Sequence, residues 1–236
     1  MNKNVILYDA LYSQFWEKFR LVTRGRCLCY PDAQLTFESR KNSQNVQVHT
    51  LKELILLKGL PTRCVGESVD AIVDFEEYYN TRNLQLPLRT SVSVFYFSRK
   101  AADQRRATPL YGLRFDYAPE TGKLDGDPIM HVQITTDQPR SRPRPYQDVE
   151  MANFLNPQDP IVQALKMSHI PSPRMPLPGV LCFLVADHLR EGVVHQLIGQ
   201  AHAILPLIPT PTLCATWFKT QFTIKQDLTG WTWYKY

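Results

Sequence analysis

The sequence is poor in cysteine and glycine and has no long apolar run. Its five cysteines are an odd, scattered set among 236 residues, which argues against a disulfide framework. The closely spaced pair Cys27 and Cys29 has no second pair with which to complete a zinc site. No stretch reaches the roughly 20 apolar residues of a membrane span, and the N-terminal segment lacks the pattern of a secretory leader. We therefore expect a cytoplasmic protein with reduced thiols and no membrane contact.

Motifs of the common cofactor-dependent and metal-dependent enzymes are also missing. The chain has no Walker loop, no dinucleotide fingerprint, no G-x-S-x-G and no H-E-x-x-H. His188, His195 and His202 recur every seven residues, but seven residues span roughly 10.5 Å along a helix, which is too far for one ion. We predict neither a metal nor a cofactor.

What the sequence does have is an ordinary globular balance with a mild excess of positive charge. It is 44% hydrophobic and 21% charged, with a formal net charge of +5, which is compatible with a polyanionic partner but does not require one. Eighteen prolines against ten glycines favour rigid connections over flexible linkers. We expect a single domain over residues 1–236.

Helical periodicity marks both ends of the chain and part of its first half. Residues 7–24 carry a wide aromatic face, which is either core or a surface that docks into a partner. The runs AQLTFES and VQVHT alternate on either side of a polar turn and predict a β-hairpin. Further helices are expected over LKELILLKG, which ends at Gly59, over ESVDAIVDFEEYYN, and within residues 158–225.

The middle of the chain has the composition of strands. Residues 91–98, 109–117 and 129–136 are rich in aromatic and β-branched residues at period two, and sequential strands with short connections form an antiparallel meander. The C-terminal run GWTWYKY is expected to add a final strand. The prediction is therefore an α+β fold, in which an antiparallel sheet of five or six strands packs with N-terminal and C-terminal helices.

Four polar residues of this meander fall on one sheet face, because side chains alternate along a strand. We call Arg114, Asp116, His131 and Gln133 the polar stripe. A symmetric loop between the strands predicts that Arg114 lies opposite His131, with Asp116 on the diagonal. A histidine oriented by a carboxylate is a general base, and a guanidinium stabilises a phosphate or an oxyanion. The alternative is a sheet face that is merely solvated.

A second set of charges lies in the connections on either side of the hairpin. Both connections leave an antiparallel meander at the same end, so their cations should converge. We call this set the basic rim; it comprises Arg99, Lys100, Arg105, Arg106, Arg140, Arg142 and Arg144. Prolines in the exit segment predict that its arginines project toward a phosphate backbone or an acidic partner, with solvated loops as the alternative. The rim should lie roughly 20 Å from His131.

The run LYGLRFDYAPETGKLDGDPIMHVQI resembles a feature of small uncharacterised bacterial proteins from toxin-antitoxin and phage-defence gene neighbourhoods. The resemblance implies that Arg114 and His131 are the catalytic candidates of a compact toxin nuclease.

Three hypotheses follow from the stripe, the rim and the resemblance. The leading one is a component of a bacterial defence or toxin-antitoxin system that binds RNA, DNA or a protein partner encoded nearby through the basic rim, with enzymatic activity left open. The second is a metal-independent ribonuclease-like toxin with His131 as general base and Arg114 as phosphate stabiliser. The third is a structural subunit whose aromatic N-terminal helix docks into a larger assembly.

Overall fold

The computed structural model describes residues 3–41, 46–62, 68–80, 88–98, 106–117, 130–135, 137–151, 170–171, 177–189 and 191–204. Its helices are α1 (Lys3–Thr23), η1 (Arg144–Tyr146), α3 (Leu177–His188) and α4 (Glu191–Ile204). Its strands are β1 (Leu28–Tyr30), β2 (Phe37–Lys41), β3 (Val46–Leu51), β4 (Ile55–Pro61), β5 (Ser68–Asn80), β6 (Arg89–Ser98), β7 (Arg106–Tyr117), β8 (Met130–Thr135), β9 (Glu150–Met151) and β10 (Ile170–Pro171).

The strands build one large, mostly antiparallel sheet. Its main path runs β1-β4-β5-β6-β7-β8-β10, while the hairpin of β2 and β3 joins through β5, and β9 lies parallel to the start of β7. This confirms the α+β prediction, the β2–β3 hairpin and the meander of β6, β7 and β8. The sheet has more strands than the five or six expected.

Two predicted helices are strands, and this accounts for the larger sheet. The run LKELILLKG lies largely in β4, and ESVDAIVDFEEYYN forms β5. Short apolar runs are compatible with both the helical and the strand period. In these two segments, pairing with neighbouring strands of the sheet determines that they are strands. Gly59 does not end a helix: it has a φ of +76° and lies where the β4–β5 register shifts between Leu57 and Leu60. A glycine suits such a bulge because it adopts positive φ without strain.

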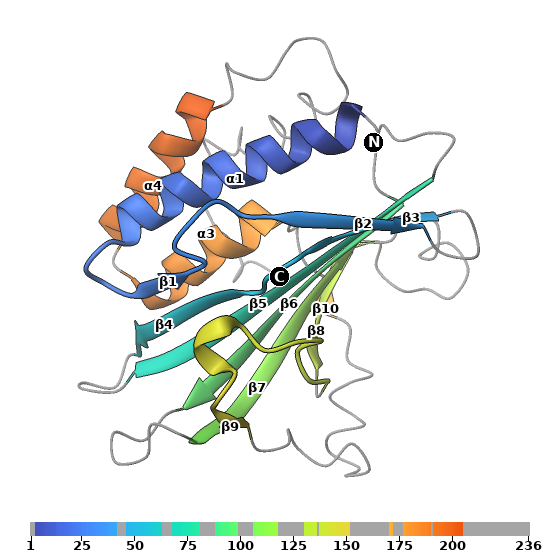
Figure 1. Ribbon diagram of the computed structural model, residues 1–236. Helices are drawn as coiled ribbons and strands as arrows, with labels where there is room; N and C mark the ends of the chain where they lie inside the picture. The colour runs from blue at the N-terminus through green and yellow to red at the C-terminus, as the bar shows by residue number, and fades with distance from the viewer. Residues whose placement is uncertain are drawn as a thin grey trace.

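Helices α1, α3 and α4 cover one face of the sheet (Figure 1). The aromatic face of α1 packs inward, with Tyr12, Phe15, Trp16 and Phe19 almost completely buried in the larger core. The helix prediction for this segment and its interpretation as core are thus confirmed, and the aromatic face is not available to a partner. Helices α3 and α4 confirm that helices lie within residues 158–225, and Pro178 is the second residue of α3.

The opposite face is covered by residues 137–151, which we call the crossing segment. Its helix η1 lies in front of the sheet in Figure 1. Tyr146 is buried beside Phe97, with ring centroids 6.0 Å apart, and its hydroxyl donates to Asp70 Oδ2. Asp70 Oδ1 accepts the Gly59 N–H at 2.8 Å. A second, smaller core forms under the segment, and it includes Leu54, Leu56, Ile72, Phe95 and Val149.

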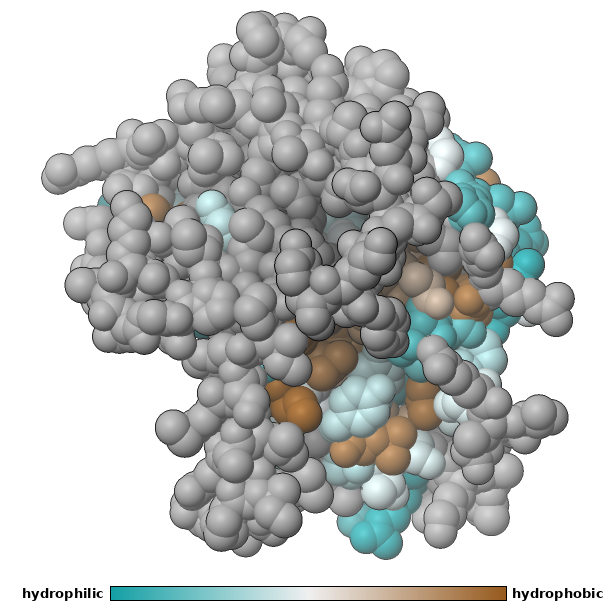
Figure 2. Space-filling view, turned by 180° about the vertical axis from the view of Figure 1, so that it is seen from behind, coloured by the Kyte–Doolittle hydropathy of each residue, from teal (hydrophilic) through white to brown (hydrophobic). Residues whose placement is uncertain are grey.

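From behind, hydrophobic side chains lie beside hydrophilic ones in the lower part of the molecule (Figure 2).

Among the helices that the structure describes, none combines the length and apolarity that crossing a membrane requires. The helix expected at residues 159–168 and the final strand GWTWYKY lie outside the described residues.

Candidate functional site

A cavity of about 210 Å³ opens on the sheet face that the crossing segment partly covers. It is lined by parts of three adjacent strands and by the start of the crossing segment: Asp74, Phe75, Glu76, Arg89, Ser91, Ser93, Phe95, Arg114, Asp137, Gln138 and Arg140. The register aligns these residues, because Ser93 lies opposite both Asp74 on β5 and Arg114 on β7. Alternation then turns the side chains of Asp74, Ser93 and Arg114 to one face.

Asp116 holds two of the three arginines of the cavity. Arg114 Nε donates to Asp116 Oδ2 at 2.7 Å, and Arg89 Nη2 lies 3.8 Å from Asp116 Oδ1. The Asp116 side chain is 5% exposed, whereas the Arg89 side chain is 45% exposed. The buried Asp116 carboxylate thus holds the Arg114 guanidinium in place through a charge-assisted hydrogen bond. Arg89 makes the longer contact and reaches solvent.

The third arginine comes from the crossing segment. Arg140 Nε lies 2.8 Å from Asp74 Oδ1, and its guanidinium also donates to the Leu51 carbonyl. Asp74 Oδ1 also accepts the Phe75 N–H at 2.8 Å. Burial raises the pKa of Asp74 above its usual value, although the Arg140 guanidinium acts in the opposite direction. Arg140 therefore partly offsets the cost of burying this carboxylate.

The cavity combines both charge signs with hydroxyl groups. Among its lining residues, three arginines face the carboxyl groups of Asp74, Glu76 and Asp137, with Ser91 and Ser93 between them. Guanidinium groups bind phosphate oxygens, and carboxylates accept the N–H groups of bases. The arrangement therefore fits a ligand that carries phosphate together with N–H donors. Within the described part of the chain, no group of three or more His, Cys, Asp or Glu side chains is arranged to hold a metal ion.

The polar stripe lies on the face expected, with a different register. Arg114 lies opposite Gln133, and Asp116 lies opposite His131, so the predicted pairing of Arg114 with His131 is wrong by two residues. A slip of two residues keeps every side chain on its face, which is why the face was correct while the partners were not. Asp116 and Gln133 are buried, so these two are not part of a solvated surface. The His131 side chain lies outside the described part of the structure.

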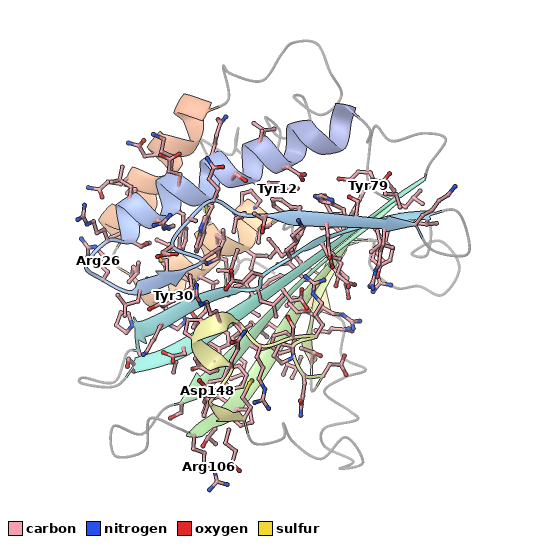
Figure 3. All side chains as sticks on the ribbon, viewed as in Figure 1. Tyr12, Arg26, Tyr30, Tyr79, Arg106 and Asp148 are labelled. Carbon is pink, nitrogen blue, oxygen red and sulfur yellow. The ribbon has the colours of Figure 1, made fainter. Side chains whose placement is uncertain are left out.

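The basic rim divides into residues with different positions. Arg99, Lys100 and Arg105 lie outside the described residues. Arg106 is exposed at the lower end of β7, pointing away from the sheet (Figure 3), and Arg144 is exposed in η1.

The prediction that the exit arginines all project is wrong, because the exit segment folds back over the sheet. Arg140 enters the cavity, and Arg142 Nη1 donates to the Val149 carbonyl at 3.1 Å. The separation of roughly 20 Å expected between stripe and rim also fails for Arg140, since it lines the same cavity as Arg114.

Sequence reasoning missed Asp74, Glu76, Arg89, Ser91 and Ser93. The pattern that could have identified them is an alternation of period two. Acidic residues alternate with the apolar residues of β5, and serines alternate with valines at the start of β6. Because β5 was predicted as a helix, the alternation of its acidic residues was not recognised.

The Cys27 and Cys29 thiols are both reduced, with their sulfur atoms 3.8 Å apart. A hydrogen bond between the two thiols raises the pKa of Cys27 and lowers that of Cys29.

In comparisons with known proteins, no protein-family model, no curated protein and no solved structure matches this chain.

Proposed function

We propose that this protein binds a single strand of RNA or DNA across the sheet face, with a phosphate group held by the arginines of the cavity. The observation that carries the proposal is the convergence of Arg89, Arg114 and Arg140, from three separate parts of the chain, on one cavity that also contains serine hydroxyls. Arginine offers a planar, always charged fork that matches the oxygens of a phosphate.

The exposures of the three arginines favour different roles. Arg114 and Arg140 are anchored by short contacts to Asp116 and Asp74 and place two guanidinium groups at fixed positions in the cavity. Arg89 is the most exposed of the three, and its contact with Asp116 is long. Turning Arg89 toward a phosphate therefore costs little, because its contact with Asp116 is long and Asp116 keeps the short bond from Arg114.

The carboxyl groups of the cavity favour a nucleotide over a simple anion. Asp137 is 61% exposed at the mouth of the cavity, and Glu76 lies on the neighbouring strand. Both can accept hydrogen bonds from base N–H groups, whereas they would repel an isolated phosphate or sulfate.

An exposed arginine extends the binding surface beyond the cavity. Arg144 lies on η1 of the crossing segment, on the same side of the sheet as the cavity. A strand of several nucleotides can contact both Arg144 and the cavity. Arg106 does not contribute, because the neighbouring Ala107 packs into the core under the crossing segment and alternation turns Arg106 to the other face. The resemblance of residues 110–134 to proteins from toxin-antitoxin and phage-defence neighbourhoods adds the context of a bacterial defence system.

The test is the binding of a fluorescent single-stranded oligonucleotide, measured by anisotropy at several salt concentrations. We expect affinity to fall steeply with salt, because bound phosphates release counterions. Arg89→Ala should weaken binding about tenfold and reduce the slope of log affinity against log salt by about 1. Arg26→Ala is the matched control: Arg26 is also exposed, and it lies after α1, away from the cavity (Figure 3).

Three outcomes contradict the proposal: absent binding, binding that is independent of salt, and equal losses in Arg89→Ala and Arg26→Ala. The same samples also test the ribonuclease hypothesis, when they are analysed for cleaved RNA. This hypothesis is worth testing because His131 lies opposite Asp116 in the sheet register. If the RNA is cleaved, and His131→Ala abolishes cleavage without weakening binding, the face is catalytic as well.

A further inference from the structure

We propose that Ser39, His49 and Asp9 form a nucleophilic site that cleaves carboxylic esters, on the sheet face opposite the cavity. The three residues come from β2, β3 and α1. The proposal is independent of nucleic-acid binding, because none of the three residues lines the cavity.

The geometry places each group in contact with the next. Ser39 lies directly opposite His49 in the β2–β3 hairpin, and Ser39 Oγ is 2.8 Å from His49 Nδ1. On the other side of the ring, His49 Nε2 is 2.5 Å from Asp9 Oδ1, a close polar contact that lacks the alignment of a hydrogen bond. The Asp9 carboxylate favours the tautomer with its proton on Nε2, which leaves Nδ1 to accept the Ser39 proton.

The surroundings fix the base and leave the nucleophile accessible. His49 is 1% exposed, and its ring stacks on Phe37 with centroids 4.9 Å apart and meets the Phe75 ring at 90°. These rings hold the imidazole in one orientation and shield it from water. Ser39 is exposed on the edge hairpin, so a substrate reaches the hydroxyl without moving the core. An oriented base beside an accessible hydroxyl is the arrangement that activates serine.

The chemistry balances with water as the only co-substrate. Ser39 Oγ attacks the acyl carbon while its proton passes to His49 Nδ1. The tetrahedral intermediate collapses, the bond from carbon to the leaving oxygen breaks, and the alcohol departs with that proton. Water then gives a proton to His49 and attacks the acyl-serine, which releases a carboxylic acid and restores Ser39. In both steps Asp9 is a positioning residue, since it acts through its contact with the histidine.

The experiment is labelling of the full chain with a fluorophosphonate probe, followed by intact-mass and peptide mass spectrometry. The probe forms a bond between Ser39 Oγ and phosphorus and releases fluoride, and the serine proton leaves through His49. We expect one adduct per folded chain, located at Ser39 and lost in Ser39→Ala. Ser98→Ala is the matched control, because Ser98 is also a strand serine and pairs with no histidine in the register.

Two further variants test the roles of the other groups. His49→Gln should slow labelling about 100-fold or more, the usual contribution of a general base. Asp9→Asn should shift the pH profile of the labelling rate, which a merely structural role would not do. Near-ultraviolet circular dichroism verifies the fold of each variant, and the Asp9→Asn profile preserves the test if His49→Gln does not fold.

The proposal is overturned if the folded wild type takes up no probe, or if an adduct persists in Ser39→Ala. It is equally overturned if folded His49→Gln is labelled at the wild-type rate. Labelling that appears only after heat denaturation also contradicts it, since the arrangement exists only in the folded chain.

Discussion

The two faces of the sheet are built from the same strands, yet they differ in what they bury. On β5, the residues Val69, Ala71, Val73 and Phe75 point to the helices and enter the aromatic core. The intervening residues of the same strand include Asp70 and Asp74, which face the crossing segment.

Each face stabilises the protein in a different way. Against the helices, buried apolar area dominates, at about 25 cal/mol per Å² removed from water. On the opposite face, each buried carboxylate has specific partners: Asp70 has Tyr146 and the Gly59 N–H, and Asp74 has Arg140. Both faces should therefore respond to lost volume, because a smaller core also lies under the crossing segment, and the cavity on that face should respond in addition to lost partners and to pH.

The largest effect expected is from truncating the aromatic core. Trp16 is fully buried, stacks on Phe19 at 5.4 Å and donates its indole N–H to the Pro31 carbonyl at 3.1 Å. Trp16→Ala should lower the free energy of unfolding by about 3–5 kcal/mol, measured by urea denaturation. The control is Leu21→Ala on the same helix, where the side chain is 58% exposed and the change should stay within about 0.5 kcal/mol. Equal losses in both variants would mean that α1 does not pack as described.

The next largest effect comes from the crossing-segment face, where β7 and β8 approach closely. A Cβ added at Gly112 would lie 2.6 Å from Thr135 Cγ2 and 3.0 Å from the Thr135 carbonyl oxygen. Gly112→Ala should therefore cost about 1–3 kcal/mol through overpacking. Thr135→Ser removes the methyl group and keeps the hydroxyl, which accepts the Asp137 N–H at 3.1 Å. The double variant should recover part of the loss in denaturant titrations. If Gly112→Ala costs the same in the wild-type background and in the Thr135→Ser background, the steric explanation is excluded.

Local patterning was sufficient to predict the meander and the face of its polar residues. Period two in β6, β7 and β8 assigns each side chain to a side, and Arg114, Asp116 and Gln133 share one face as predicted. It could not predict the partners across the β7–β8 pair, because the register depends on the conformation of residues 118–129, which composition does not determine.

The sites depend on contacts that no local pattern contains. Arg140 reaches Asp74 only because the exit segment folds back over the sheet. That path is driven by burial of Tyr146 against Phe97 and Asp70, far away in sequence. The hairpin prediction put Ser39 and His49 on neighbouring strands, but their pairing depends on the register, and Asp9 joins them only when α1 packs on the sheet. Tertiary packing thus brings Arg140 to the cavity and Asp9 to the Ser39–His49 pair.

The smallest effect expected depends on pH and separates the two faces most clearly. Removing Arg140 leaves Asp74 buried without its guanidinium, so Arg140→Ala should cost about 1–2 kcal/mol at neutral pH. Burial already raises the folded-state pKa of Asp74 above 3.8, and Arg140 opposes that rise. The variant therefore has the higher folded pKa, and its penalty is present at neutral pH. That penalty shrinks as the pH falls through the raised pKa values toward 3.8, since protonated Asp74 no longer needs a cation.

Urea denaturation of wild type and Arg140→Ala, repeated from neutral pH down toward pH 3.8, measures the penalty. Part of the penalty should remain at low pH, because the variant also lacks the hydrogen bond to the Leu51 carbonyl. Arg144→Ala, which removes an exposed arginine of η1, should change stability by less than about 0.5 kcal/mol at every pH. A penalty for Arg140→Ala that is constant with pH would show that Asp74 does not depend on Arg140. The contribution of paired charges, which distinguishes the crossing-segment face from the helix face, would then fail at the cavity itself.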